Sequence, residues 1–480
     1  EIDSTKRTSG MKHKFLFILL FSLVLEGMVT TQAVAGDYVH QVNTLIGTKG
    51  TGLTSGYLYP GATYPYGMVQ FTPSYFSKRS GFVINQLSGG GCEHMGNFPT
   101  FPVKGKLKMS PDNILNYRIN VSEEKGHAGY YEAMVQEDIK AKLTVTERTG
   151  MASYEYPADQ QYGTIIIGGG ISATPIEQAA IVITAPNKCE GYAEGGNFCG
   201  LRTPYKVYFV AEFDTDAFET GTWKREELMP NTTFAEGEYS GVYFTFDVNK
   251  KKNIQYKIGV SYVSVENARE NLKAENAEWD FQKIQNQAEA KWNHYLGMIE
   301  VEGTNPDRTT QFYTHLYRSF IHPNVCSDVN GEYMGADFRV HKSRSKHYTS
   351  FSNWDTYRTQ IQLLSMLDPE VASDIVISHQ LFAEQSGGSF PRWVMANIET
   401  GVMQGDPTPI LIANAYAFGA RNYDPKPIFK IMRKGAEEPG SKSQDVETRP
   451  GLNQYLDKGY YNASIQLEYT SADFAIGQFA

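Results

Sequence analysis

The chain has few cysteines and no excess of basic charge. Its four cysteines include no Cys-x-x-Cys pair, so no cysteine-based zinc site is expected. Lys and Arg number 44 against 53 Asp and Glu, which gives a net charge of -9. No basic run occurs outside the extreme N-terminus, so the sequence argues against a nucleic-acid partner.

The chain also lacks an apolar run long enough to span a bilayer, which needs about 20 residues. The apolar run 15–25 follows a basic start and precedes the small-residue cleavage pattern Ala-Val-Ala at 33–35. Residues 11–35 are therefore predicted to be a signal peptide, and no cysteine near the cut marks a lipoprotein. We expect an exported bacterial protein, periplasmic or extracellular, with no stable membrane span after cleavage. Residues 1–10 precede the first plausible initiator and are predicted to be an upstream leader or a non-native segment.

Residues 36–264 carry short alternating or β-branched runs, separated by turn residues, and predict an antiparallel β-sandwich domain. Two segments, 47–67 and 81–102, hold more Gly and Pro than strands tolerate and are expected to be functional or domain-contacting loops. The second contains Gly89-Gly90-Gly91, which has neither the G-x-G-x-x-G spacing nor a βαβ unit around it, so a nucleotide site is rejected. The expected strands include 67–71, 141–146, 163–167, 205–210, 241–246 and 256–263.

Beyond residue 264 the hydrophobic period changes to that of helices. Residues 265–305 are predicted to be a linker of one or two helices, and residues 306–480 a helical domain. Its last segment runs to Ala480 with no Gly, Pro or basic stop signal. Six helices are half of the twelve in an (α/α)6 toroid, so we expect a toroid that is truncated about halfway. The six segments are 306–321, 355–367, 369–386, 408–419, 425–436 and about 465 to the terminus.

The cysteines leave the disulfide pattern open. Cys189 and Cys199 are ten residues apart in a glycine-rich stretch interpreted as a loop, and export would allow them to form a disulfide. Two free thiols fit the same pattern equally well. Cys92 follows the glycine cluster, and Cys326 follows a predicted helix.

The stretch from Ser352 to Arg358 places an indole, a carboxylate and a guanidinium where a loop enters a helix. Ser352 or Asn353 can cap that helix, which would put Trp354 and Asp355 in its first turn. A ring beside a carboxylate can bind a sugar, although a core Trp beside a capping Asp fits equally well. Aromatic residues make up 13% of the chain, which is common in carbohydrate-active proteins and in β-rich proteins alike.

An ordered series of motifs from about residue 37 to Ala480 resembles glycoside hydrolase family 92, the calcium-dependent exo-α-mannosidases of bacteria. Each motif is weak alone, and their order makes the resemblance specific. The motifs are PGATYPYGMV (60–69), GF (81–82), LSGGGC (87–92), NFCG (197–200), FYTHLY (312–317), SDVNGEY (327–333), WDTYR (354–358), PRW (391–393), MQGDP (403–407), AYAFG (415–419) and LEY (467–469).

The resemblance implies a β-sandwich and an (α/α)6 barrel with the active site between them, and inverting hydrolysis of terminal α-mannose with bound Ca²⁺. Inversion needs two carboxyl groups about 6.5–9.5 Å apart, one protonated and one ionised. The Gly- and Asn-rich loops that supply these groups in the family do not occur before residue 480. We therefore expect no catalytic acid or base within the chain, most Ca²⁺ ligands beyond it, and a fragment without activity.

The resemblance also implies that Trp354 and Asp355 bind the terminal mannose. Arg392 and Trp393 are the next candidates, with Arg392 either contacting sugar hydroxyls or packing between domains. Gly90, Gly91 and Cys92 complete the predicted substrate-binding set. Members selective for α-1,2 linkages are thought to use a Trp after this loop, and its absence here leaves the linkage open.

Three further residues are expected to support the site. Arg358 lies three residues past Asp355 on the expected helix, so an ion pair between them is predicted. Asp406 is expected to cap the helix near Thr408, with substrate contact as the alternative. Glu468 is expected to position another group, because Asp473 lies on a different helix face and cannot pair with it as acid and base.

The segment from Asp328 to Glu332 resembles part of an EF-hand loop but lacks the 12-residue spacing. A solvated or substrate-facing loop is preferred to a metal site, so the metal ligands stay unknown. His94, His315 and His322 are expected to be structural or surface residues, and the side chain of His379 to lie on a helix face.

Three functions are compared. The preferred one is an exo-α-mannosidase acting on α-1,2-linked or other terminal mannose of N-glycans or mannans. A non-catalytic carbohydrate-binding fragment is an alternative from a different class. The third is another sandwich-plus-toroid enzyme, a polysaccharide lyase or a glycoside phosphorylase. A lyase would need a basic groove, whereas this chain is acidic.

Overall fold

The computed structural model describes residues 36–48, 56–74, 81–112 and 120–480. The predicted leader 1–10 and signal peptide 11–35 lie outside these residues. Tyr38 to Ala480 form one compact unit. No helix within the described ranges combines the length and apolarity that a membrane span needs.

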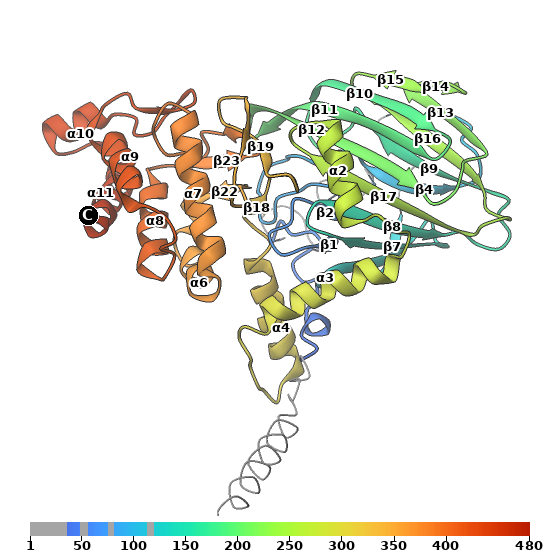
Figure 1. Ribbon diagram of the computed structural model, residues 1–480, viewed down its shortest axis with the longest axis horizontal. Coiled ribbons are helices and arrows are strands. Elements are labelled where there is room, and N and C mark those ends of the chain that lie inside the picture. The colour runs from blue at the N-terminus through green and yellow to red at the C-terminus, as the bar shows by residue number, and fades with distance from the viewer. Residues whose placement is uncertain (1–35, 49–55, 75–80, 113–119) are drawn as a thin grey trace, which may run out of the picture. The chain divides into compact units, whose positions relative to one another are not determined.

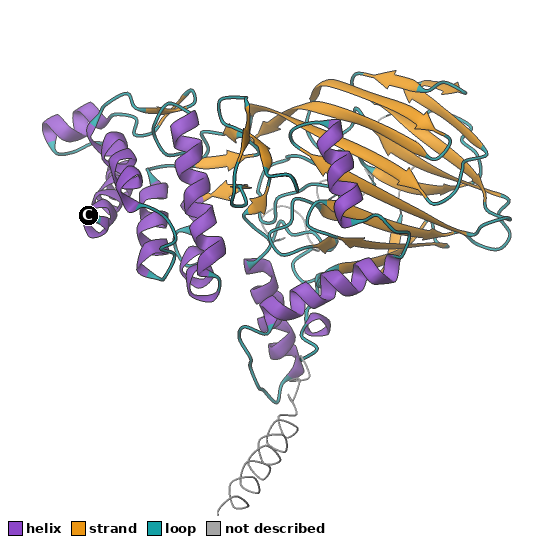
Figure 2. Cartoon of the chain, viewed as in Figure 1, coloured by secondary structure: helices purple, strands orange, loops and turns teal. Residues whose placement is uncertain are grey.

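Two large sheets form the β-rich first half of this unit (Figures 1 and 2). The first sheet has the order β1-β2-β3-β4-β9-β16-β13-β14 and the second β15-β10-β11-β12-β17-β8-β7-β6-β5, and neighbouring strands pair antiparallel. The first sheet consists of β1 (Ala62–Thr63), β2 (Gln70–Pro73), β3 (Phe82–Val83), β4 (Thr100–Lys104), β9 (Tyr162–Gly168), β13 (Glu219–Lys224), β14 (Glu227–Pro230) and β16 (Ser240–Asp247). The second consists of β5 (Val121–His127), β6 (Tyr130–Val135), β7 (Ile139–Val145), β8 (Thr149–Glu155), β10 (Ile176–Ala185), β11 (Lys188–Phe198), β12 (Leu201–Phe213), β15 (Phe234–Glu236) and β17 (Asn253–Ser261).

The two sheets share one hydrophobic core. Phe82 and Trp223 of the first sheet and Tyr154 and Phe209 of the second belong to the same buried cluster. Side chains alternate between the two faces of a strand, and in β12 every second residue from Tyr205 to Phe213 belongs to this core. The predicted antiparallel β-rich N-terminal domain is confirmed, and each expected strand run overlaps a strand.

The disulfide does not join the pair considered from the sequence. Cys92 and Cys199 are bonded, with their Cα atoms 5.2 Å apart, while Cys189 and Cys326 are free and buried. The stretch from Cys189 to Cys199 is not a loop, because most of it is strand β11. Ten residues of strand span about 33 Å, far beyond the ~7 Å Cα separation that a disulfide allows.

Two helices follow the sheets. Helix α2 (Val265–Glu275) is capped by Ser264, and α3 (Phe281–Leu296) by Asp280. Helix α2 packs on β12 and β17, and α3 packs on β7 and on a short 3-10 helix, η1 (Val39–Gln41). Both helices of the predicted linker therefore pack on strands of the second sheet.

The C-terminal part is helical, with short paired strands between the helices. The predicted helical C-terminal domain is confirmed, while the expectation of a half toroid stays a prediction. The helices are α4 (Pro306–Ser319), α5 (Asn353–Thr356), α6 (Gln360–Leu367), α7 (Pro369–Gln385), α8 (Pro407–Ala417), α9 (Pro425–Glu437), α10 (Leu452–Lys458) and α11 (Ala463–Phe479). The strands are β18 (Asn324–Val325), β19 (Glu332–Met334), β20 (Val340–Lys342), β21 (Tyr348–Thr349), β22 (Phe351–Ser352), β23 (Trp393–Met395), β24 (Ile398–Glu399), β25 (Lys442–Ser443) and β26 (Val446–Glu447).

The predicted helix 355–367 is wrong in one respect, because it is broken between α5 and α6. The carbonyl of Tyr357 accepts hydrogen bonds from the side chains of Gln362 (2.9 Å) and Asn414 (3.1 Å). Side chains thus satisfy a backbone group that a continuous helix would have paired internally. Helix α10 lies in a segment where no helix was predicted.

Asp328, the first residue of the segment that resembles part of an EF-hand loop, is buried at a structural junction. The carboxylate of Asp328 accepts hydrogen bonds from Ser261 (2.7 Å), Asn267 (2.8 Å) and Asn271 (2.6 Å). Its oxygens are therefore committed to β17 and α2, and the preferred reading as a solvated or substrate-facing loop is wrong for Asp328 itself. The contact joins the start of the helical part to the sheets.

Candidate functional site

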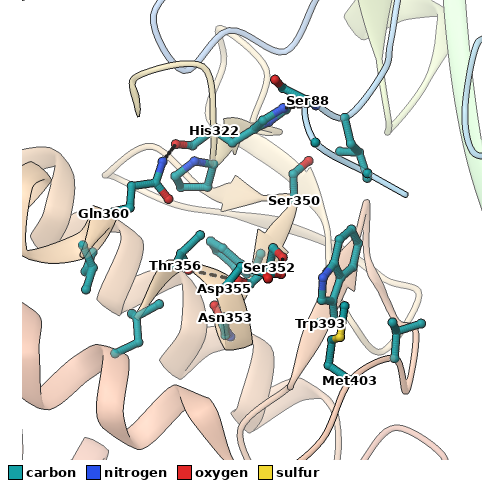
Figure 3. Close-up of a pocket in the computed structure, with 18 of the residues that line it drawn as sticks. Ser88, His322, Ser350, Ser352, Asn353, Asp355, Thr356, Gln360, Trp393 and Met403 are labelled. Atoms are coloured by element: carbon teal, nitrogen blue, oxygen red, sulfur yellow. Dashed lines mark hydrogen bonds between the residues drawn. The ribbon is translucent and has the colours of Figure 1, made fainter. Parts of the chain in front are cut away.

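A cavity of about 460 Å³ lies between the sheets and the helical part (Figure 3). Its walls include the loop after β3, the turn between β11 and β12, the end of α4, the segment around α5, strand β23 and the loop after β24. The lining residues include Ser88, Gly90, Gly91, Cys92, Phe198, Arg318, His322, Ser350, Ser352, Asn353, Asp355, Thr356, Gln360, His379, Trp393 and Met403. The volume is typical of a small-ligand site.

The buried imidazole of His94 and the half-buried imidazole of His322 hold the glycine loop at one wall. The N–H of Leu87 donates to Nε2 of His94 (2.8 Å), and the N–H of Ser88 donates to Nε2 of His322 (2.7 Å). Each Nδ1 then donates, from His94 to the carbonyl of Cys92 (2.7 Å) and from His322 to Asn324 (2.6 Å). Burial lowers the pKa of both histidines to about 4, so both rings are neutral acceptors at pH 7.

The close approach of His94 explains why Gly90 is a glycine. A Cβ atom at this position would lie 2.8 Å from Cε1 of His94, whereas at Gly91 the nearest atom would be 4.0 Å away, on Tyr57. Cys92, the next residue, is tied by its disulfide to Cys199 on the β11–β12 turn. The predicted substrate-binding loop therefore lines the cavity and is fixed at both ends.

Helix α5 brings Asp355 to the cavity and Trp354 to the opposite side. The carboxylate of Asp355 accepts a hydrogen bond from Ser352 Oγ, and the side chain is exposed. The indole N–H of Trp354 donates to Glu468 (3.0 Å), and the guanidinium of Arg358 lies 4.0 Å over the indole ring. Trp354 does not line the described cavity, so its predicted contact with substrate stays a prediction.

Two expected roles near α5 are resolved by these contacts. The ion pair predicted between Arg358 and Asp355 is wrong, because the guanidinium stacks on Trp354 and donates to the carbonyl of that residue. Glu468 has the expected positioning geometry, since it holds the indole. Asp473 bonds elsewhere, to Arg449 (2.6 Å), so it does not act with Glu468 as a pair.

Trp393 forms the aromatic wall. Its ring stacks on Phe198, with centroids 4.4 Å apart and planes at 29°, and it pairs across β22–β23 with Ser352. The buried carboxylate of Glu399 accepts the backbone N–H groups of Arg392 (2.5 Å), Trp393 (3.3 Å) and Gly401 (2.8 Å). Three donors on one carboxylate fix the backbone that presents the indole.

Arg392 points away from the cavity into its own loop. The guanidinium donates to five carbonyl oxygens, on Gly401, Met403, Gly405, Glu447 and Thr448. A guanidinium has five N–H donors, so these contacts account for its capacity. Of the two roles considered for Arg392, the geometry favours packing over sugar contact.

Asp406 occupies the N-cap position of α8, but its side chain does not cap the helix. Residues N1 and N3 of α8 are Pro407 and Pro409, which have no N–H to donate. The carboxylate instead pairs with the buried Arg449, with Nε 2.9 Å from Oδ2. The expected capping bond is therefore wrong, and Asp406 joins α8 to the loop before α10.

Polar groups of the cavity lie in its middle and on the side opposite the aromatic wall. In Figure 3, Trp393 and Met403 lie on one side, Gln360 and His322 on the other, and Asp355, Ser352 and Thr356 between them. Among the described lining residues Asp355 carries the single carboxylate. The arrangement can bind a polyhydroxylated ring, but it lacks the second carboxyl group that inverting hydrolysis needs.

Two family models match consecutive parts of the chain. One, described as the glycosyl hydrolase family 92 N-terminal domain, matches residues 41–261, and the other, described as the glycosyl hydrolase family 92 catalytic domain, matches residues 267–480. The chain belongs to glycosyl hydrolase family 92. The resemblance drawn from the ordered motifs is therefore confirmed.

Solved structures of family 92 have a similar fold. A family GH92 α-mannosidase from Bacteroides thetaiotaomicron has a TM-score of 0.82 at 24% identity, over 93% of this chain and 63% of that chain. A family GH92 inverting mannosidase from the same organism has a TM-score of 0.81 at 25% identity, over 94% of this chain and 63% of that chain. A curated relative, an uncharacterised secreted glycosidase from Arthroderma benhamiae, is 24% identical over 518 residues, which cover 95% of this chain and 62% of the relative. The family-92 chain thus spans less than two thirds of the length of these relatives.

Several cavity residues of this family-92 chain were not singled out from its sequence. Ser350, with a left-handed φ of 62°, turns the chain between β21 and β22, and Gln360 donates to the carbonyls of Ser319 (2.9 Å) and His322 (3.0 Å). Arg318 donates to the carbonyls of Tyr59 (3.1 Å) and Thr44 (2.8 Å). The sequence gives no local signal for Gln360 and Arg318, because the carbonyls that they contact lie in distant segments.

Proposed function

We propose that the whole protein is an exported exo-α-mannosidase that removes terminal mannose with inversion. The observation that carries the proposal is the cavity in which Trp393 and Asp355 share one space in a family-92 chain. The mannosidase activity is supported by the similar structures, of which one is described as an inverting mannosidase. Export is supported by the predicted signal peptide and by the secreted relative.

In the proposed complex, a terminal mannose of an N-glycan or mannan lies with its apolar face on the Trp393 ring. Its hydroxyl groups bond to Asp355 and to the hydroxyls of Ser352 and Thr356, which line the same space. Apolar walls with a few fixed polar groups are the usual design of small-ligand sites. These residues bind and orient the sugar and exclude water from one face.

The acid and the base of the reaction are proposed to come from outside these 480 residues. Inverting hydrolysis needs one carboxylic acid to protonate the leaving oxygen and one carboxylate to activate water. Asp355 alone cannot serve both purposes, because the two groups must hold different protonation states at the same pH. The chain as given is accordingly proposed to bind sugar without hydrolysing it.

A calcium requirement is also proposed, from the family resemblance. Ca²⁺ takes six to eight oxygen ligands, carboxylates among them. The described cavity offers one carboxylate, so its residues do not form a complete calcium site. No step is assigned to the ion here, and its remaining ligands would have to come from other parts of the whole protein.

The other two functions are not favoured. A polysaccharide lyase that binds uronic acids needs a basic groove, and the cavity is lined by one arginine, whose side chain is bonded to the carbonyls of Tyr59 and Thr44. A purely binding role applies, on this proposal, to the 480-residue chain alone. The whole protein and the chain must therefore be tested side by side.

The test measures hydrolysis of an aryl α-mannoside by the whole protein and by the 480-residue chain, with mannose binding measured on both. We expect hydrolysis by the first only, binding by both, and a β-anomeric first product by NMR. Asp355→Asn should weaken binding, whereas Asp159→Asn, an exposed residue of the β-rich part, should not. Hydrolysis by the 480-residue chain would overturn the placement of the acid and base. Retention of configuration would overturn inversion, and full activity after calcium removal would overturn the metal requirement.

A further inference from the structure

A second cluster of ligand-type side chains lies outside the cavity, where three distant segments meet. His40 lies on η1, His127 ends strand β5, and Glu289 lies in the middle of α3. One imidazole nitrogen of each histidine and one oxygen of Glu289 all lie within 4.8 Å of one another. None of the three residues lines the cavity.

The backbone that carries the exposed His40 and the ring of His127 are both held by neighbouring residues. The side chain of Asn293, also on α3, accepts the N–H groups of Tyr38 (2.9 Å) and Val39 (3.0 Å), which fixes η1 against the helix. His127 stacks on Tyr130, its partner across the β5–β6 turn, with centroids 5.0 Å apart. The cluster is therefore set by the fold and not by a chance approach of long surface side chains.

The carboxylate already binds one imidazole. Oε1 of Glu289 lies 2.8 Å from Nε2 of His127 and accepts a second bond from Gln285 Nε2 (2.6 Å). The centroid of the His40 ring lies 4.6 Å from the centroid of the His127 ring.

We propose that His40, His127 and Glu289 form a binding site for a divalent transition-metal ion of the zinc class. Two imidazoles and one carboxylate are a known three-ligand set for Zn²⁺, with water in the fourth position. In a tetrahedral site two ligand atoms are about 3.4 Å apart. The His127–Glu289 pair at 2.8 Å would therefore open slightly, and the more distant ligand atoms would approach by roughly an ångström. Ca²⁺ prefers an all-oxygen set, so it does not compete here.

The metal would join the start of the described chain to the second sheet and to α3. Signal cleavage near residue 36, as predicted, places His40 a few residues from the mature N-terminus. A metal ion that binds only the folded state stabilises it, and the stabilisation grows with the logarithm of the ratio of the free metal concentration to the dissociation constant. Its role is therefore to hold the N-terminal segment, and hydrolysis does not depend on it.

The experiment titrates the metal-free chain with Zn²⁺ by calorimetry and records the thermal shift. We expect one saturable site and an upward shift in the wild type. His40→Ala, at an exposed position, and Glu289→Gln, which keeps an acceptor for His127, should each weaken binding by about tenfold or more. His315→Ala removes an exposed histidine on α4 and is the matched control, with unchanged binding expected.

Two results would overturn the proposal. One is the absence of saturable Zn²⁺ binding to the wild type. The other is binding that stays unchanged in both His40→Ala and Glu289→Gln, which would place the ion elsewhere. Excess Ca²⁺ should leave the Zn²⁺ titration unchanged, and displacement of Zn²⁺ by Ca²⁺ would contradict the assigned donor set. None of these readouts uses hydrolysis, so they are independent of the proposed mannosidase activity.

Discussion

Removal of the Cys92–Cys199 disulfide should destabilise the folded unit by an amount that follows from the loop it closes. The two cysteines are 107 residues apart. A disulfide that closes a loop of this length lowers the entropy of the unfolded chain, which should stabilise the folded state by ~5 kcal/mol at 25 °C. The loss of a native disulfide typically costs about 2–5 kcal/mol. A unit of about 440 residues has an unfolding entropy of ~0.9 kcal/mol/K, so the midpoint should fall by ~5 °C or slightly less.

The assay compares the wild type and the double variant Cys92→Ser/Cys199→Ser, each with and without a thiol reductant. Reductant should lower the wild-type midpoint to that of the variant and leave the variant unchanged. Thiol titration of the denatured, unreduced wild type should find two groups, since Cys189 and Cys326 are free, and four after reduction. Four thiols before reduction, or a variant as stable as the wild type, would refute the reasoning.

Three further perturbations test the cavity walls. Gly90→Ala should cost about 1–3 kcal/mol of stability, because its Cβ would lie 2.8 Å from a buried ring that two hydrogen bonds hold in place. Gly91→Ala is the control and should cost little, since the nearest atom to its Cβ would be 4.0 Å away. Equal losses of stability for the two variants in denaturant titrations would contradict this prediction. Burial lowers the pKa of His322 from 6.5 to about 4, so between these pH values the unfolded chain binds a proton that the folded chain does not. The free energy of unfolding should therefore fall by ~3 kcal/mol for this residue as the pH drops from 6.5 to 4. His322→Asn should make stability depend less on pH in this range, and an unchanged pH dependence would argue against this role of His322. Trp393→Ala should weaken mannose binding by about 1–2 kcal/mol. Trp354→Phe loses the hydrogen bond to Glu468 but keeps a ring beneath Arg358, and it should change the free energy of mannose binding by less than about 1 kcal/mol. The reverse order of effects would show that the sugar contacts Trp354.

The parts of the fold that were predictable depend on short-range signals. Helix α9 begins at Pro425 after Asp424, whose side chain accepts the N–H of Lys426 (3.0 Å). Such a start needs only neighbouring residues, so a single sequence reveals it. The strand runs were found for the same reason, because alternation of side chains is local.

The failures occur where distant segments decide the outcome. The break after α5 depends on Asn414, which is 57 residues away in the sequence, and the disulfide joins two loops 107 residues apart. Arg392 was a candidate for sugar binding because its loop matches the family motif. Two of the five carbonyls that hold its guanidinium, those of Glu447 and Thr448, lie more than 50 residues away in the sequence. The missing cap at Asp406 is different, since Pro407 and Pro409 were visible and exclude most of the donors a cap would use.

The stacking of Trp393 on Phe198 has a consequence for how the molecule unfolds. One ring belongs to the helical part and the other to strand β11, next to the cysteine that holds the glycine loop. A ligand seated among these groups contacts both parts at once and binds only when both are folded. Ligand binding should therefore raise the cooperativity of unfolding, so that transitions separable in the free protein merge into one in the complex.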